Sequence, residues 1–94
     1  MEELKLLCDG DEISFSLKPI DGTLYGEIAT KKVAMWCRDN KKCILHFRDF
    51  EAEVRLDRFG FNWVFEIGDF RIVINAGVHG KTSVLITGGD IGVE

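Results

Sequence analysis

The amino-acid sequence predicts an all-β protein, a small antiparallel meander of eight or nine short strands that forms a barrel or a two-layer sandwich. Large apolar residues recur at every second position along most of the 94 residues, as they do in strands with one buried face. Ten glycines, several of them beside an aspartate, separate these stretches at the spacing of hairpin turns. No window of helix length gives a convincing i, i+3, i+4, i+7 pattern, so we expect a single all-β domain over residues 1–94.

The clearest element is a hairpin in which residues 61–67 and 70–76 pair around a Gly-Asp turn. Its register brings suitable partners together on each face: Ile67 with Phe70, Phe65 with Ile72, Trp63 with Ile74, and Glu66 with Arg71. The apolar face, which includes Phe61 and Trp63, is expected to lie in the core, and the pair of opposite charges is expected on the surface. Hydrophobic period, turn chemistry and charge all favour the same register.

The remaining strands are predicted from the same period of two. They cover residues 3–8, 12–18, 23–29, 32–37, 43–48, 50–57 and 82–87. Pro19 is expected in the connection between the second and third strands, where its missing N–H breaks no ladder hydrogen bond. Pairing Leu17 with Leu24 then places Phe15 across from Gly26, and the aromatic ring fills the space that the glycine leaves.

Residues 32–57 predict two successive hairpins. In the first, strands 32–37 and 43–48 pair so that Cys37 lies opposite Cys43, and in the second Phe47 meets Phe50. One face of both hairpins is uniformly apolar and is expected in the core. The other face carries Lys32, Trp36, His46 and Arg48, and the adjacent turn carries Lys41 and Lys42.

The same segment concentrates positive charge. Residues 31–48 contain six Lys or Arg and one Asp, a net charge of +5, whereas the rest of the chain carries −9 of the total of −4. A basic strip with an exposed tryptophan suits an acidic protein surface, and it also suits the phosphates and bases of a single-stranded nucleic acid. The candidate partner-binding residues are therefore Lys32, Trp36, Lys41, Lys42, His46 and Arg48. The alternative interpretation assigns Trp36 to a second core layer and the lysines to a soluble edge.

The three cysteines are an odd number, which disfavours a disulfide framework and indicates a reducing, cytoplasmic environment. Cys37, Cys43 and His46 lack the C-x2-4-C spacing of a structural zinc site, and free cysteine usually packs as a small hydrophobe. We therefore expect no metal and no cofactor. The acidic N-terminus has no signal-peptide pattern, and no apolar run reaches the ~18 residues that span a bilayer, so no membrane association is expected.

The sequence does not predict an enzyme. Nucleophilic catalysis needs a Ser or Cys beside a base and an orienting carboxylate, and the histidines are limited to His46 and His79. We expect His46 to pair with Glu51 on the outer face, and His79 lies in a glycine-rich loop. The carboxylates alternate outward on strands or lie in turns, so no pair of acids is predicted in a pocket.

Size, acidity and the basic segment favour a non-enzymatic intracellular β-domain that binds and occupies a protein partner. An inhibitor, an immunity or antitoxin-type protein, and a phage or plasmid accessory protein all act in this way. The first alternative is a small barrel that binds single-stranded nucleic acid through residues 31–48. The second is a structural subunit that forms homo-oligomers through unpaired edge strands, such as the strand that ends at Thr87.

Overall fold

The computed structural model describes residues 2–58, 60–77 and 80–89, and the all-β prediction is confirmed. The elements follow in the order β1 (Glu2–Cys8), β2 (Asp11–Ile20), β3 (Thr23–Ala29), α1 (Lys32–Arg38), β4 (Lys42–Phe47), β5 (Phe50–Arg55), β6 (Asn62–Ile67), β7 (Phe70–Ala76) and β8 (Lys81–Gly88). Each of these eight strands lies within a few residues of a predicted one. The predicted strand at 32–37 is instead the helix α1.

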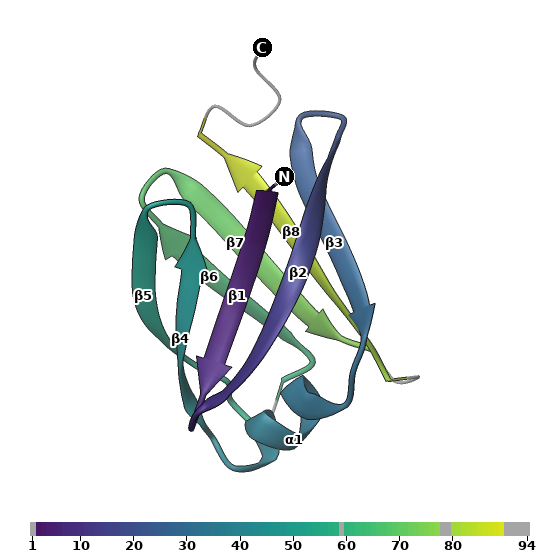
Figure 1. Cartoon of the computed structure of the whole chain (residues 1–94), viewed down its shortest axis with the longest axis vertical. Coiled ribbons are helices and arrows are strands. Elements are labelled where there is room, and N and C mark those ends of the chain that lie inside the picture. Colours follow the sequence, from purple (N-terminus) through teal and green to yellow (C-terminus); the bar gives the residue numbers. More distant parts are fainter. Residues whose placement is uncertain (1, 59, 78–79, 90–94) are drawn as a thin grey trace.

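The strands form one antiparallel sheet in the order β5-β4-β1-β2-β3-β8-β7-β6. Figure 1 shows this sheet curled into a nearly closed barrel, with α1 lying across its lower end. The edge strands β5 and β6 face each other without a hydrogen-bonded ladder. The strand that ends at Thr87 was expected at an edge, but β8 lies inside the sheet, because it forms hydrogen-bonded ladders with β3 on one side and β7 on the other.

Alternate side chains from every strand fill the barrel. The largest that are fully buried include Phe15, Phe47, Leu4, Leu6 and Leu45. At the end opposite α1, Phe70 packs edge-on against Phe47 and Phe50, with ring centroids 5.2 and 5.7 Å apart. Since Phe50 belongs to β5 and Phe70 to β7, these rings join the two sides of the barrel where no ladder does.

The β6–β7 hairpin has the predicted register, including the Glu66–Arg71 pair, whose Oε1 and Nε atoms are 3.6 Å apart on the surface. Trp63 is buried as expected, with 6% of its surface exposed. Phe61 is not in the core, because 68% of its surface is exposed. It precedes β6 at the α1 end of the barrel, where no facing layer covers it.

The β2–β3 register differs from the prediction by two residues. A two-residue Asp21-Gly22 turn, with φ of 49° and 77°, pairs Ile20 with Thr23, so the longer predicted connection is wrong. Pro19 therefore lies within β2, past the end of the described β1–β2 ladder at Leu17. The slip by two keeps the same faces inward.

Gly26 is consequently covered by β2 itself, and the predicted contact with Phe15 is wrong. A Cβ added at Gly26 would lie 2.6 Å from the carbonyl oxygen of Ser16 and 3.0 Å from Leu17 Cδ2. Such a separation is too short for any side chain, so the close approach of β2 and β3 at this point requires glycine.

Residues 32–38 form a helix because β3 and β4 are not neighbours. Two other strands, β1 and β2, separate them in the sheet, so the chain must cross the end of the barrel. As a helix, the segment turns Val33 and Trp36, at i and i+3, into the core. The hydroxyl of Thr30 accepts the backbone N–H of Lys32 at 3.1 Å where the helix begins. The predicted hairpin of 32–37 with 43–48, and its Cys37–Cys43 pair, are therefore wrong.

Cys43 instead forms a disulfide with Cys8. β1 pairs with β4 from Leu4–Phe47 to Leu7–Ile44, and the two cysteines continue this ladder with Cα atoms 4.5 Å apart. A disulfide was disfavoured by the odd number of cysteines, and that expectation is wrong for Cys8 and Cys43, whereas Cys37 is free. The argument for a reducing environment, which rested on the odd number of cysteines, loses its basis.

We predict that Trp63→Ala lowers the free energy of unfolding by about 3–5 kcal/mol, because it removes a large aromatic side chain from the core. Phe61→Ala is the matched control, since this ring is largely exposed, and it should change stability by no more than about 0.5 kcal/mol. Denaturant titration of the two variants measures both. Similar losses for both would show that Phe61 belongs to the core.

The disulfide closes a loop between residues 35 positions apart, so its loss should lower the free energy of unfolding by about 3–4 kcal/mol. We expect the doubly substituted Cys8→Ser, Cys43→Ser protein to show this loss, and Cys37→Ser to stay near the parent. Thiol titration of the denatured, unreduced protein should find Cys37 alone. Three reactive thiols would contradict the bond.

Candidate functional site

The six predicted binding residues do not share one face. Trp36 is buried with 8% of its surface exposed, so it cannot be the exposed anchor at the centre of a strip. Lys32 lies in α1, and Lys41 and Lys42 lie where β4 begins. His46 and Arg48 lie toward the other end of β4. Residues 32–48 were predicted as a hairpin. The candidate binding residues lie apart because residues 32–38 form a helix instead of a strand. Binding by the five exposed or half-buried residues stays a prediction.

The basic side chains of this set are paired with the acidic part of the chain. The pairs are Lys32 with Asp11 (2.7 Å), Lys41 with Asp9, Lys42 with Glu53 (3.5 Å), His46 with Glu51 (3.4 Å) and Arg48 with Glu2 (2.7 Å). The His46–Glu51 pair was expected from the sequence. Most of the predicted positive strip is thus balanced within the domain, and it has little free charge for a partner.

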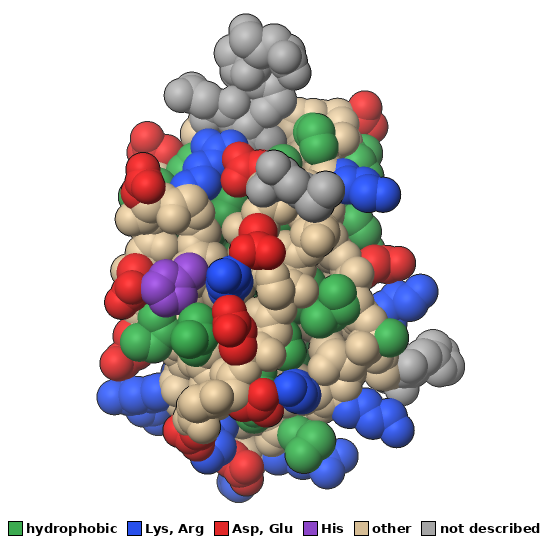
Figure 2. All heavy atoms as spheres, in the orientation of Figure 1, with side chains coloured by type: hydrophobic (Ala, Val, Ile, Leu, Met, Phe, Trp, Pro, Cys, Tyr) green, Lys and Arg blue, Asp and Glu red, His purple; other side chains and the backbone are tan. Residues whose placement is uncertain are grey.

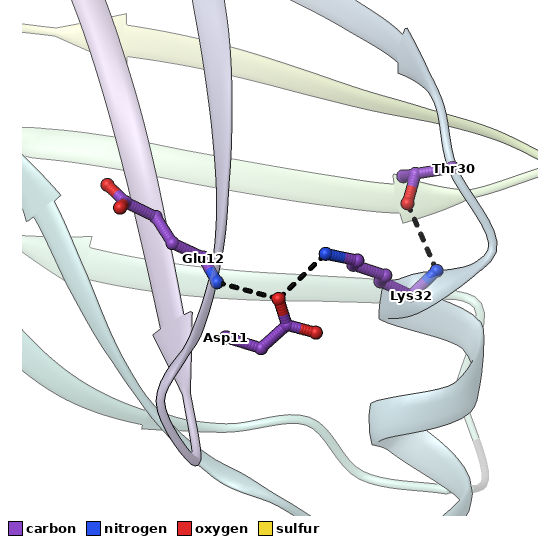
Figure 3. A network of polar contacts seen from close by, with 4 residues as sticks. All are labelled: Asp11, Glu12, Thr30 and Lys32. Carbon is purple, nitrogen blue, oxygen red and sulfur yellow. Dashed lines mark hydrogen bonds and ion pairs between the residues drawn. The ribbon is translucent and has the colours of Figure 1, made fainter.

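Figure 3 shows how one of these pairs holds α1 in place. Asp11 Oδ1 accepts hydrogen bonds from Lys32 Nζ at 2.7 Å and from the backbone N–H of Glu12 at 3.1 Å. The hydrogen bond from Lys32 keeps the pKa of Asp11 below its ordinary value of 3.8. In the same way, the Asp9 carboxylate raises the pKa of Lys41. These contacts join the β1–β2 turn to both ends of the segment that crosses the barrel end, residues 32–41, which we call the crossing segment.

A different set of cations lacks such partners. Among residues 2–58, 60–77 and 80–89, Lys18, Lys31, Arg38 and Arg55 have no ion pair. Lys31, Met35 and Arg38 are spaced i, i+4, i+7 and are exposed, so they form the outer face of α1. Met35 has 58% of its surface exposed. A strand prediction cannot find this set, because it places Lys31 and Arg38 in turns.

Charge is also separated along the barrel axis. We define the α1 end as α1, the turns beside it and the strand residues that adjoin them. Its cations are Lys31, Lys32, Arg38, Lys41, Lys42, Arg55, Arg58 and Lys81, and its carboxylates are Asp9, Asp11, Asp39 and Asp57. Figure 2 shows Lys and Arg side chains around the lower end of the molecule, where Figure 1 places α1. Among described residues, the opposite end defined in the same way carries Arg48 against Glu2, Asp21, Asp49 and Asp69.

A pocket of about 270 Å³ opens beside α1. Buried Trp63 and Ala76 lie at its floor, half-buried Ala34 and Cys37 form the wall on α1, and exposed Arg38, Arg58 and Phe61 surround its mouth. Trp63 Nε1 donates a hydrogen bond to the carbonyl oxygen of Asp57 at 3.1 Å, which fixes the orientation of the ring. Asn40 Oδ1 accepts the backbone N–H of Arg58 at 3.1 Å, which ties the segment after α1 to the chain that follows β5.

The Cys37 thiol in this pocket is not an activated nucleophile. Burial raises its pKa, and the positive charge of Arg38 opposes this only in part. Its Sγ–H is directed at the carbonyl oxygen of Ala34, at 3.1 Å. Cys37, Cys43 and His46, whose spacing was considered for a metal site, do not form one, because Cys43 is bonded to Cys8 and its sulfur is no longer a thiolate ligand. His79 lies outside the described residues.

A second hollow, of about 380 Å³, lies over β1, β2 and β4 and contains His46 and Arg48. Its charges have both signs: Lys5 Nζ lies 3.4 Å from Glu3 Oε1 and 3.8 Å from Glu12 Oε1. Since these charges neutralise one another, this hollow has no preference for an anion or a cation. The pocket beside α1 is the stronger candidate site.

Comparison of the chain with protein-family models, with curated proteins and with solved structures gives no match. Over residues 2–58, 60–77 and 80–89, no helix has the length and the apolar character that crossing a membrane requires. Over the same residues, no three His, Cys, Asp or Glu side chains form a group that could hold a metal ion.

We predict that the Asp11–Lys32 contact makes stability depend on acid pH. Because the folded pKa of Asp11 is lowered, the contact stabilises the fold fully above the unfolded pKa near 3.8 and is lost as the pH falls through the folded value. The Asp11→Asn variant should therefore show a smaller loss of stability than the parent below pH 4. Denaturant titrations at neutral and acid pH measure it, with Asp21→Asn in a turn at the other end as control. Equal acid sensitivity of parent and Asp11→Asn would contradict the assignment.

Proposed function

We propose that this domain acts without catalysis, by binding and occupying an acidic surface of a protein partner through its α1 end. The observation that carries this proposal is the outer face of α1, where the unpaired cations Lys31 and Arg38 flank exposed Met35. Phe61, at the mouth of the neighbouring pocket, extends the exposed apolar area. Apolar anchors surrounded by cations are typical of sites that recognise acidic proteins.

The two kinds of side chain have different roles in such binding. Met35 and Phe61 supply area that is removed from water on contact, and this area stabilises the complex. Lys31, Arg38 and Arg55 attract an acidic partner over a distance and raise the association rate. The acidic opposite end disfavours the reverse orientation of the partner, so the charge separation also selects which end is used.

Occupation of a partner surface is how inhibitors, immunity or antitoxin-type proteins and phage or plasmid accessory proteins act, and we propose one of these roles. A barrel joined by the Cys8–Cys43 bond presents a rigid surface, which lowers the entropic cost of binding. The bond also changes the proposed compartment: we favour an oxidising one over the cytoplasm predicted from the cysteine number.

Single-stranded nucleic acid is the second candidate, and one observation favours it. Phe61 is an exposed aromatic ring beside Arg38 and Arg58, an arrangement that can stack a base and bind its phosphate. The acidic carboxylates on the rest of the surface oppose a polyanion, so we rank a protein partner first.

Homo-oligomer formation would have to use the edges of β5 and β6, and light scattering tests it.

We test the proposal by photo-crosslinking in extracts of the source cells. A crosslinking amino acid at Met35 should give an adduct with an acidic protein, and the same group at Ile20, an exposed residue at the opposite end, should not. Lys31→Glu combined with Arg38→Glu should then weaken the purified complex at least about tenfold at low salt, with a smaller effect at high salt. Lys18→Glu is the matched control.

Three results would contradict the proposal. The first is an adduct formed equally well from Ile20, and the second is a complex unaffected by the charge reversals. The third is tight binding of a fluorescent oligothymidylate that depends on Phe61 and Arg38, which would favour nucleic acid instead.

A further inference from the structure

The pocket beside α1 has the volume and lining to accept one apolar side chain. An apolar cavity of about 150 Å³ holds a benzene molecule, so about 270 Å³ accommodates an aromatic or large aliphatic side chain together with a small polar group. It is smaller than the 300–1,000 Å³ that is usual for drug-sized ligands. Trp63, Ala76 and Ala34 line it with apolar surface.

The mouth of the same pocket favours a negative charge. Arg38 has no ion pair in the described part of the chain, and it lines the pocket beside Cys37. A guanidinium group binds a carboxylate through two parallel hydrogen bonds, which gives direction as well as strength. The site therefore presents an apolar interior with the guanidinium group of Arg38 at the opening.

We propose that this pocket binds the C-terminal residue of the protein partner, with an apolar side chain inside and the terminal carboxylate on Arg38. A chain terminus is the simplest peptide element that carries a large apolar group and a carboxylate on the same carbon atom. An internal Asp or Glu has the charge without the apolar group, and an internal Phe or Leu has the apolar group without the charge. This inference rests on the proposed binding of a protein at the α1 end.

Cys37 provides the readout, because its thiol lines the pocket and is the one cysteine outside the disulfide. The probes are the peptide acetyl-Gly-Ser-Gly-Phe as the free acid, the same peptide as the C-terminal amide, and acetyl-Gly-Asp-Gly amide. We expect the free acid to slow alkylation of Cys37 by iodoacetamide. The amide should bind about tenfold more weakly, since it loses the charge-assisted hydrogen bonds.

Amide and indole NMR signals give an independent measurement on the full chain. The free acid should shift the indole N–H of Trp63 and the backbone N–H of Gly60, both of which line the pocket. Arg38→Gln should weaken this binding about tenfold, and Arg55→Gln, at the same end but outside the pocket, should not. The variants are compared by NMR because Arg38 itself influences the reactivity of Cys37.

A variant that fills the pocket tests whether the peptide binds inside the pocket or on the surface beside it. Ala34→Leu places a larger side chain into the pocket on a helix that tolerates leucine, and it should abolish binding of the free acid. Ala29→Leu, an exposed position in β3, is the control for the added volume.

Equal affinity of the free acid and the amide, or signals of Trp63 and Gly60 that neither peptide moves, would overturn this inference. Binding of the acetyl-Gly-Asp-Gly amide as tightly as the free acid would overturn it in favour of an internal acidic residue. Protection of Cys37 by oligothymidylate alone would overturn it in favour of a nucleic acid. If the peptides fail while Lys31→Glu with Arg38→Glu still weakens the crosslinked complex, the proposed function stands and only this inference fails.

Discussion

The pairing of β1 with β4 is the contact on which the rest of the structure depends. It places Leu4 opposite Phe47 and Leu6 opposite Leu45 at the centre of the core, and it brings Cys8 beside Cys43. Once β1 occupies this position, β3 and β4 cannot form a hairpin, because β1 and β2 lie between them. The chain must then cross the end of the barrel, and a helix crosses it while keeping its backbone hydrogen bonds within itself.

The same pairing determines which charges are available to a partner. It brings the acidic start of β1 and the acidic β1–β2 turn next to the basic segment, where Glu2 pairs with Arg48 and Asp9 with Lys41. Charges neutralised in this way contribute to positioning the crossing segment and add little to recognition. At the α1 end, the described cations that remain for a partner are Lys31 and Arg38 on the outer face of α1 and Arg55 at the end of β5.

Local pattern predicted two of the hairpins formed by consecutive strands, whereas the β2–β3 hairpin differs from its prediction by two residues. The β4–β5 and β6–β7 hairpins have their predicted registers because apolar period and cross-strand pairs act between near neighbours in the chain. Residues 32–38 were ambiguous in sequence, since Val33 and Cys37 fit a period of two as well as a helical one, and the distant β1–β4 contact decides between them. The disulfide depends on that contact too. In the candidate site, Arg38 was placed in a turn and Phe61 in the core, so the pocket could not be predicted.

Helix α1 divides two roles between neighbouring residues. Trp36 and Val33 face inward and close the core, whereas Met35 and Arg38 face outward. A helix of seven residues is too short to be stable alone, so its outer face exists only because its inner face is packed. Loss of the inner face would therefore unfold α1 and remove the outer face with it. A substitution of Met35 or Arg38 alone can change recognition without changing the core. The core holds the unpaired cations beside the pocket at the one end of the barrel where a helix, rather than a strand, forms the surface.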